Sequence, residues 1–534
     1  MAILLLEQAR FHQARSFYRD IYNGNDKFYL AASRTETWTD DTAPDTSVDN
    51  RVDVQKFRDK ILFVKRVQSA DTAMLARRID WDSTGNTVYD RYDDAYTATN
   101  KANSGAISLQ TSNFYVLTDA FNVYKCIDNN GNAKSTSKPD STGTEIFTTA
   151  DGYKWKFLFQ VGASDRTKFL STSYMPVRKV SGAGQPSFDV NGELNSINVS
   201  AGGSGYTSVP TVTINGDGTG ATASAALTGS AVSSITIDTA GSGYTFADVV
   251  ITGGGGANAK ADAVLGSTDT PSLQTNVEGT AVKGTIDNII VTNQGTDYTS
   301  GDVTLTITGD GQGATCAAVV NTNGNITGVT ITNPGSGYTT ASITVTQASG
   351  GGINASFRCI IAPLDGHGAH PQKELFCKRV GVTVSFDNDS RDLITGNDYR
   401  QVGLMKNITK YGLDTLFSDA TGSPHFVIGI SDPNNYGADD ILEATSGGNF
   451  TVAQLRDTTG NGTDDSVYLQ ENTSGIGSSD TITNLTKGLS SLPINSLANP
   501  EIDIDSGDIV YFDNRKPITR EEGQVETVKI IFTF

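Results

Sequence analysis

One phrase, a tyrosine next to glycine or aspartate, occurs four times between residues 190 and 360 and restricts the fold more than any other feature. Apolar residues stand nine and seven positions before each tyrosine. This period of two is typical of a short strand with one buried face. The four copies centre on Tyr206, Tyr244, Tyr298 and Tyr338.

Each copy continues in the same way after its tyrosine. A second alternating pair follows, such as Val212 and Ile214, then a glycine cluster, then a run of alternating small residues. Each unit therefore predicts three short strands and two glycine turns. We expect residues 190–360 to form an inserted four-unit β-repeat array, with an extra segment around "GSTDTPSLQTNVEGT" in the longest interval.

The glycines in these phrases predict turns rather than a ligand site. A phosphate-binding glycine loop lies between a strand and a helix, and no helical pattern follows "GSGYT". Glycine adopts the positive φ angles that tight turns need. The tyrosines are expected to cap the small core of each unit, and the alternative is an exposed tyrosine row that binds glycan.

The segments on either side of the repeats predict a mainly β chain with a few helices. Helical spacing of apolar residues covers 7–22, and a second helix is expected near 51–60. "KFYLAASRTETW" predicts a strand that ends at Trp38. Residues 1–185 and 361–534 are therefore expected to be two parts of one body, with a Gly-, Ser- and Thr-rich surface insertion at about 420–495. The final "KIIFTF" is expected to dock in a sheet.

Composition excludes several classes of protein. The net charge of −19 argues against nucleic acid as a direct partner. The four cysteines lack any C-x-x-C spacing, which favours free thiols in a reducing compartment. "MAILLLEQAR" is too short for a secretory signal, and no stretch approaches the roughly 18 apolar residues of a membrane span. We expect a protein made and folded in a cytoplasm, with no membrane partner.

No motif predicts catalysis, a cofactor or a metal. Asp217 and Asp310 lie among glycines, but calcium β-rolls need a strict tandem repeat. The loop from Asp457 begins like a calcium loop, yet it lacks the acidic residue at its last ligand position. His367 and His370 are three residues apart, but glycines beside them favour a turn over a helix. We expect a protein that is not an enzyme.

"ARRIDW" is the clearest candidate contact segment. It places Arg77 and Arg78 beside Trp81, and arginine and tryptophan are favoured at protein interfaces. The alternative is an aromatic core contact with the two arginines at its rim.

The order of several segments resembles a known family. "SRTETW", "ARRIDW", "VYKCID", "DGYKWKFLFQV", "TGNDYRQVGL" and "GDIVYFDNRKPI…VKIIFTF" follow one another as in the baseplate wedge subunits of contractile-tailed, myovirus-type bacteriophages. The matching segments cover about half of the chain, roughly 10–180, 375–415 and 500–534. The regions 190–360 and 420–495 have no counterpart in that pattern.

The resemblance implies a non-enzymatic structural protein of the virion tail baseplate, assembled in the host cytoplasm. It implies a layered β-sandwich, a homodimer, and contacts with other wedge proteins and possible tail-fibre proteins. The extra regions should leave the sandwich from surface loops. The alternatives are a glycan-binding adhesin and, with nothing in its favour, an envelope hydrolase. The positions carried over as candidate core or interface residues are Trp38, Arg77, Arg78, Trp81 and Arg515.

Overall fold

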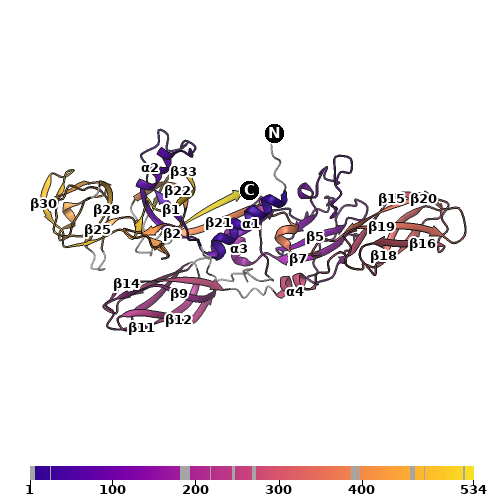
Figure 1. Ribbon diagram of the computed structural model, residues 1–534, viewed down its shortest axis with the longest axis horizontal. Helices are drawn as coiled ribbons and strands as arrows, with labels where there is room; N and C mark the ends of the chain where they lie inside the picture. The colour runs from indigo at the N-terminus through magenta and orange to yellow at the C-terminus, as the bar shows by residue number, and fades with distance from the viewer. Residues whose placement is uncertain are drawn as a thin grey trace.

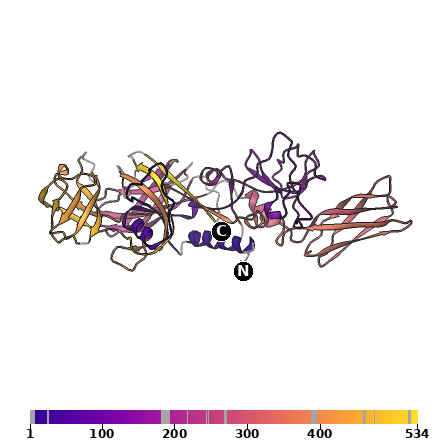
Figure 2. The same cartoon turned by 90° about the horizontal axis from the view of Figure 1, so that it is seen from above.

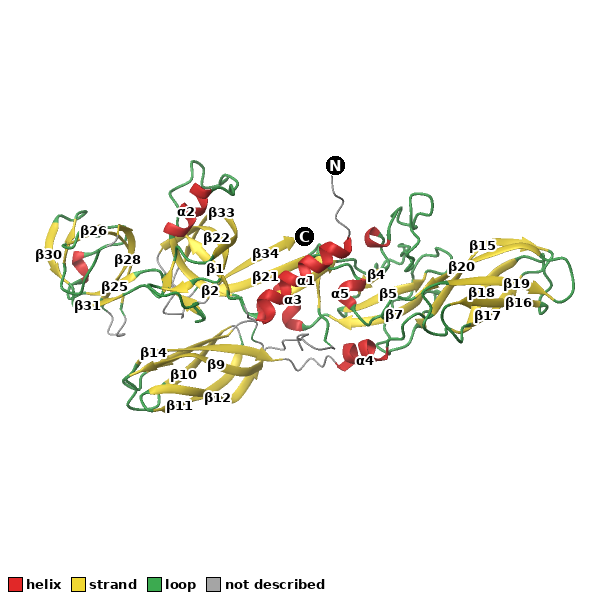
Figure 3. Cartoon of the chain, in the orientation of Figure 1, coloured by secondary structure: helices red, strands yellow, loops and turns green. Residues whose placement is uncertain are grey.

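The computed structural model describes residues 7–23, 26–180, 193–216, 218–242, 244, 247–266, 272–386, 394, 397–457, 463–473, 475–520 and 524–534. The chain is mainly β, as predicted. It forms an elongated molecule with a central body and three β-domains attached to it (Figures 1 and 2). Most of the helices lie in the middle, and the two ends of the long axis consist mainly of strands and loops (Figure 3).

Two antiparallel sheets pack face to face in the body and form a β-sandwich. Leu30 and Leu404 of the first sheet share a buried cluster with Val382 and Ile530 of the second. The first sheet has the order β24 (Thr421–Gly422), β2 (Ile61–Arg66), β1 (Phe28–Ser33), β22 (Asn397–Lys406), β33 (Asp508–Arg520). The second has the order β34 (Glu526–Thr533), β21 (Arg379–Phe386), β3 (Thr72–Arg77), β8 (Tyr174–Val177).

The central strand β1 is buried on both faces because two different layers cover it. Leu30 points into the sandwich, whereas Tyr29 faces a second cluster that includes Phe57 of helix α2 (Arg51–Asp59). The Asn50 side chain caps α2 by accepting hydrogen bonds from the backbone N–H groups of Val52 and Asp53. Both predicted N-terminal helices are confirmed.

A third sheet and helix α1 (Glu7–Asn23) complete the body. Phe11, Ala14 and Tyr18 of α1 are buried in a cluster shared with Met74 and Leu158. The third sheet has the order β4 (Tyr115–Leu117), β5 (Asn122–Asp128), β7 (Lys154–Gln160), β6 (Phe147–Thr148). The short helices α3 (Ala163–Phe169) and α5 (Pro371–Glu374) lie in the connections around it.

The four repeat units form two separate domains rather than one array. Helix α4 (Ser272–Thr280) lies in the long interval between them, and Figure 1 shows the domains at different places along the molecule. The first repeat domain contains β9 (Glu193–Ser204), β10 (Thr211–Gly216), β11 (Thr219–Thr228), β12 (Ala231–Ser242), β13 (Ala247–Thr252) and β14 (Ala257–Gly266). The second contains β15 (Ile286–Thr296), β16 (Val303–Gly309), β17 (Thr315–Val320), β18 (Ile326–Asn333), β19 (Ala341–Gln347) and β20 (Ile353–Ile361).

The expected single array is corrected because each unit finds its strand partners in one neighbour only. In the first domain β9 pairs with β14, β10 with β13 and β11 with β12. In the second, β15 pairs with β20, β16 with β19 and β17 with β18. The first strand of one unit thus pairs with the third strand of the other, and the second strands pair with each other. Two units therefore pair all of their strands with each other, so a third unit would find no strand to pair with in this way.

Residues 426–498 form a third attached domain, at the opposite end of the molecule from the second repeat domain (Figure 1). Its core contains Phe426, Leu442, Phe450, Val467 and Ile482. Its seven-stranded sheet has the order β30 (Leu489–Pro493), β29 (Thr481–Asn484), β26 (Ile441–Ala444), β27 (Asn449–Arg456), β28 (Ser466–Thr473), β25 (Phe426–Gly429), β31 (Ser496–Ala498). Before and after it, β23 (Thr409–Lys410) pairs with β32 (Ile502–Asp503).

Two further predictions concern strand ends. The last strand does dock: β34 pairs with β21 along its whole length. The strand expected to reach Trp38 ends at Ser33, after a register shift at Ala32, and the Trp38 backbone N–H donates to the Asp41 carboxylate in a turn.

Among the described residues, no helix has the length and hydropathy needed to cross a membrane.

Candidate functional site

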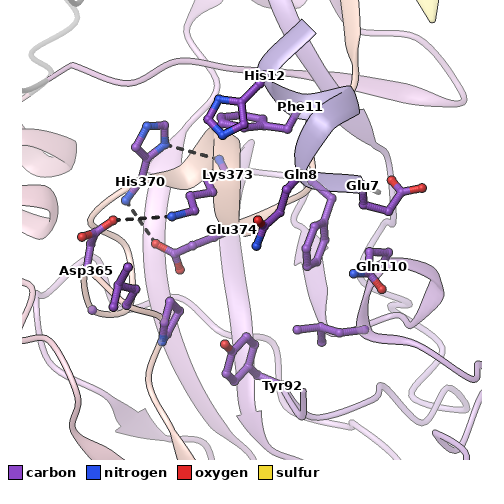
Figure 4. Close-up of a pocket in the computed structure, with 15 residues that line it drawn as sticks. Glu7, Gln8, Phe11, His12, Tyr92, Gln110, Asp365, His370, Lys373 and Glu374 are labelled. Atoms are coloured by element: carbon purple, nitrogen blue, oxygen red, sulfur yellow. Dashed lines mark hydrogen bonds and ion pairs between the residues drawn. The ribbon is translucent and has the colours of Figure 1, made fainter. Parts of the chain in front are cut away.

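A half-open cavity of about 450 Å³ lies beside the start of α1 (Figure 4). Phe11, Tyr92 and Leu109 are among the buried apolar residues that line it. Residues 363–376 supply the opposite wall, which includes the "DGHGAH" segment.

The acidic groups of this cavity are already held by cations of the same chain. Glu7 lies 2.8 Å from Lys378, and Glu374 lies 2.7 Å from Lys125. Glu374 also accepts hydrogen bonds from the backbone N–H groups of Gly368 and His370. Burial alone would raise the pKa of Glu374, but Lys125 and the other donors lower it. Such a carboxylate is fixed in its charged form and is poorly suited to move protons.

The histidines of the cavity are not arranged for acid–base chemistry either. The His370 Nδ1 accepts the backbone N–H of Lys373 at 3.3 Å and caps α5. Burial, with the charges of Lys179 and Arg15, lowers the pKa of His370 to about 4. His12 is exposed at the rim and stands 5.7 Å from the Phe11 ring. The cavity therefore offers an apolar floor and a rim of paired groups.

The five candidate contact residues fall into two groups. Trp38 and Arg515 meet, because the Trp38 indole N–H donates to the Arg515 carbonyl at 2.8 Å, and the Arg515 side chain pairs with Asp513 at 3.0 Å. They join the loop after β1 to β33. Neither residue is buried, so this contact lies at the surface.

The "ARRIDW" residues lie elsewhere, beside the third sheet. Arg77 donates to the Ser112 carbonyl at 2.7 Å, and Arg78 contacts Asp80 at 2.8 Å. The Trp81 indole N–H donates to the Ser135 hydroxyl at 3.2 Å. All three thus make polar contacts within the chain, and the tryptophan packs against a buried aromatic cluster.

The four repeat tyrosines are buried, with exposed fractions of 3–5%. Each ring lies over a glycine of the partner unit: Tyr206 over Gly256, Tyr244 over Gly218, Tyr298 over Gly352 and Tyr338 over Gly311. A Cβ atom at any of these glycines would overlap the ring. The rings cannot form an exposed row, because each closes the contact between two units.

The tyrosine hydroxyls and the glycines three residues before each tyrosine also have structural roles. The hydroxyls of Tyr244, Tyr298 and Tyr338 each accept a backbone N–H from the facing strand at 3.3 Å. Three residues before each tyrosine stands a glycine with φ between +62° and +67°. Only glycine adopts that angle without strain. The phrase is a structural element, as its glycines predicted.

The calcium candidates have other roles or lie outside the described residues. Asp310 accepts the backbone N–H groups of Thr339 and Thr340, at 2.8 and 2.9 Å, and the Thr339 hydroxyl. These hydrogen bonds lower the pKa of Asp310, and the bond from the Thr339 hydroxyl has the largest effect. They also hold the turn after Tyr338 in place. Asp217 and residues 458–462 of the other loop are not described. The described part of the chain contains no group of three or more ligands placed for a metal.

The sequence patterns did not indicate a buried ionic cluster that lies beneath the cavity. Lys125 is fully buried, and its ammonium group lies 4.0 Å from the Tyr92 ring centroid as well as beside Glu374. His367 lies 3.2 Å from Asp287 in the same region. The "VYKCID" strand carried the lysine, but its partner Glu374 is 249 residues away. No local pattern could have indicated the pair.

No family model matches the chain, and no curated protein matches it. A function for the chain must therefore be inferred from its own sequence, fold and contacts.

Proposed function

We propose that this protein is a structural subunit of a phage tail baseplate wedge, acting as a homodimer among other wedge proteins in the virion. One observation supports this most strongly. The segments that resemble that family are far apart in the sequence, yet they assemble into neighbouring strands of the body. Segments 395–404 and 507–518 contribute to β22 and β33, which pair with each other, and 33–38 begins at the end of β1, which pairs with β22.

The segments without a counterpart in the family support the same proposal. Both repeat domains and the seven-stranded domain have cores of their own outside the sandwich. A chain can lengthen in this way without disturbing its body, because the insertions leave from connections rather than from the middle of strands. In this proposal the three added domains extend the surface available to neighbouring wedge or fibre proteins.

The chemistry of the cavity is compatible with a structural role. Its acidic groups are neutralised within the chain, and its one strongly shifted histidine caps a helix. A cavity with an apolar floor and paired rim can receive a side chain of a partner without any reaction.

Electron cryo-microscopy of intact tail particles tests the proposal directly. We expect density for the elongated body and its three attached domains in the baseplate, as paired copies. Light scattering after gel filtration should give twice the monomer mass at micromolar concentration. A protein that is monomeric under these conditions and missing from tail particles would refute the proposal. Binding of an isolated repeat domain to a glycan array would instead favour an adhesin.

A further inference from the structure

The root of the second repeat domain contains a buried polar cluster that the proposed function does not use. Asp287 stands at the start of β15, and its carboxylate lies 3.2 Å from the His367 Nε2. The next residue, Asn288, donates to the Ile127 carbonyl of β5 at 3.2 Å. On the paired strand, Arg358 of β20 forms two hydrogen bonds with the buried Asp93. Both strands at the root are therefore fastened to the body.

The chain enters and leaves the domain through one tightly packed place, which we call the arm joint (residues 277–288 and 358–374). Gly366 and Gly368 have φ angles of +97° and +87°. A Cβ at Gly366 would lie 2.7 Å from the Val282 carbonyl oxygen, and one at Gly368 2.5 Å from a methyl group of Val277. The two glycines of "DGHGAH" thus let the exit segment lie against the entry segment, with His367 held between them.

His367 is held there as a neutral ring. It is 5% exposed, and its Nδ1 has no hydrogen-bond partner among the residues that the structure describes, so the ring proton belongs on Nε2, where it is donated to Asp287. The ring also meets Tyr92 edge-on, with centroids 5.0 Å apart.

A second proton on the His367 ring would lie on Nδ1, which is buried and has no acceptor among the described residues. The charged groups that act on the ring are the carboxylates of Asp287 on β15 and Glu374 on α5 and the ammonium group of Lys125 on β5. Glu374 and Lys125 pair with each other at 2.7 Å. Lys156 on β7 lies near this pair, and Glu145 is the charge that acts on it most. A buried N–H donor without an acceptor is costly.

The effects on the pKa of His367 act in both directions. Burial is the largest, and it lowers the pKa of the ring; the Lys125 charge lowers it further, while Asp287 and Glu374 act in the opposite direction. Once the joint opens, the ring returns to water and to an ordinary pKa near 6.5. Docking is therefore strongest above about pH 6.5 and weakens as the pH falls below that value.

We propose that the arm joint is an acid-sensitive latch, in which protonation of His367 releases the second repeat domain from the body while the domain itself stays folded. The domain can stay folded because its sequence from 286 to 361 contains no histidine and its core is its own. This inference holds whether or not the protein belongs to a baseplate.

Hydrogen exchange of the full-length protein, read by mass spectrometry at pH 7 and pH 5 and corrected for intrinsic exchange rates, tests the latch. One set of peptides covers the arm joint, where the Ala362 N–H donates to the Thr285 carbonyl at 2.9 Å. The other covers β16 and β19 inside the domain. We expect protection at the joint to fall by about tenfold to thirtyfold at pH 5, while β16 and β19 keep theirs.

His367→Gln is the matching variant, because its amide can still donate to Asp287 but does not titrate. His370 lies in the same joint and burial also lowers its pKa, so the effect of His367→Gln is measured in a His370→Gln background. There, His367→Gln should show less than a twofold change at the joint between the two pH values. His12→Gln, at an exposed histidine, should behave like the wild type. The proposal is overturned if joint protection does not change with pH in the His370→Gln background, if β16 and β19 lose protection together with it, or if His367→Gln keeps the full pH response in that background. Should His367→Gln fail to dock at pH 7, the comparison of joint and domain peptides in the His370→Gln protein still decides.

Discussion

The two repeat domains have the same strand pairing but differ in how they are attached. The second is attached through buried groups of the body and the joint, including Asp93 and His367. They contact β20 and β15 at the end of the domain that meets the body. Among the described residues, the contacts of the first with the body include Ala70, which joins its core, and the Lys260–Glu501 ion pair, which is partly exposed. The repeat phrase therefore encodes a self-contained pair of units. The attachment of each pair is decided by residues outside the phrase.

The largest expected effect comes from separating the two units of a pair. A fragment of residues 281–362 should fold alone and give a cooperative thermal transition by circular dichroism. A fragment of 281–324 should be unfolded, because its first and third strands both lose their partners, β20 and β18. A folded 281–324 fragment would show that the unit, not the pair, is the domain.

Breaking the buried attachment of the second domain should be the next largest effect. Asp93→Asn leaves the Arg358 guanidinium without its carboxylate, and we expect a loss of about 3 kcal/mol. Because Asp93 is fully buried and belongs to the body, the loss should appear in docking and in the third sheet rather than in the repeat fold. Hydrogen exchange can separate these regions; equal loss of protection inside β16 and β19 would contradict the distinction.

Adding one methyl group under a repeat tyrosine should destabilise its own domain only. Gly352→Ala forces the Tyr298 ring to move and should cost about 2 kcal/mol in denaturant unfolding. Gly351→Ala is the control, because a Cβ there meets nothing within 4 Å, and it should change stability by less than about 0.5 kcal/mol. Gly256→Ala should act in the same way on the first domain. If only one domain responds, the two are not built alike.

The stability of the seven-stranded domain should fall in acid, whereas the stability of the two repeat domains should not. His425 at its edge is buried, which lowers its pKa to about 3, whereas an unfolded histidine titrates near 6.5. The unfolded state therefore binds the proton first, and stability falls as the pH drops below about 6.5, by about 2 kcal/mol at pH 5. Denaturant titrations at pH 7 and 5 should show this loss in the wild type and little of it in His425→Gln. The two repeat domains contain no histidine and should show no such dependence.

The smallest expected effect concerns the ion pair of the first repeat domain. Lys260→Gln should cost less than about 1 kcal/mol, because partly exposed pairs are screened by water and salt. The same measurement that detects Asp93→Asn is the appropriate check. A loss as large as that of Asp93→Asn would mean that the two attachments do not differ in strength.

Much of the local structure was predictable. The helices α1 and α2, the strands around the resemblance segments and the three-strand composition of each repeat unit all follow from apolar spacing and turn residues. Two errors have physical causes. The strand expected to reach Trp38 stops at Ser33, where pairing with β2 shifts register, and the four units close in pairs because their edges are satisfied mutually.

The candidate site was predicted less well. Trp38 and Arg515 were named separately, and their hydrogen bond spans 477 positions of the chain. "DGHGAH" was correctly expected to turn, but its role depends on Val277 and Val282, which precede the domain that the motif follows. Lys125 would be exposed in an isolated strand, and only Glu374 makes its burial possible.

The amino-acid sequence by itself determined where strands and turns occur, because alternation and positive φ angles are properties of a few consecutive residues. It also determined that each repeat phrase contains glycine turns beside one tyrosine. The tertiary structure alone decided which unit each tyrosine reaches, which domain is firmly attached, and why His367 stays uncharged. These depend on pairing and burial between residues hundreds of positions apart, and their free energy exists only once the whole chain has folded.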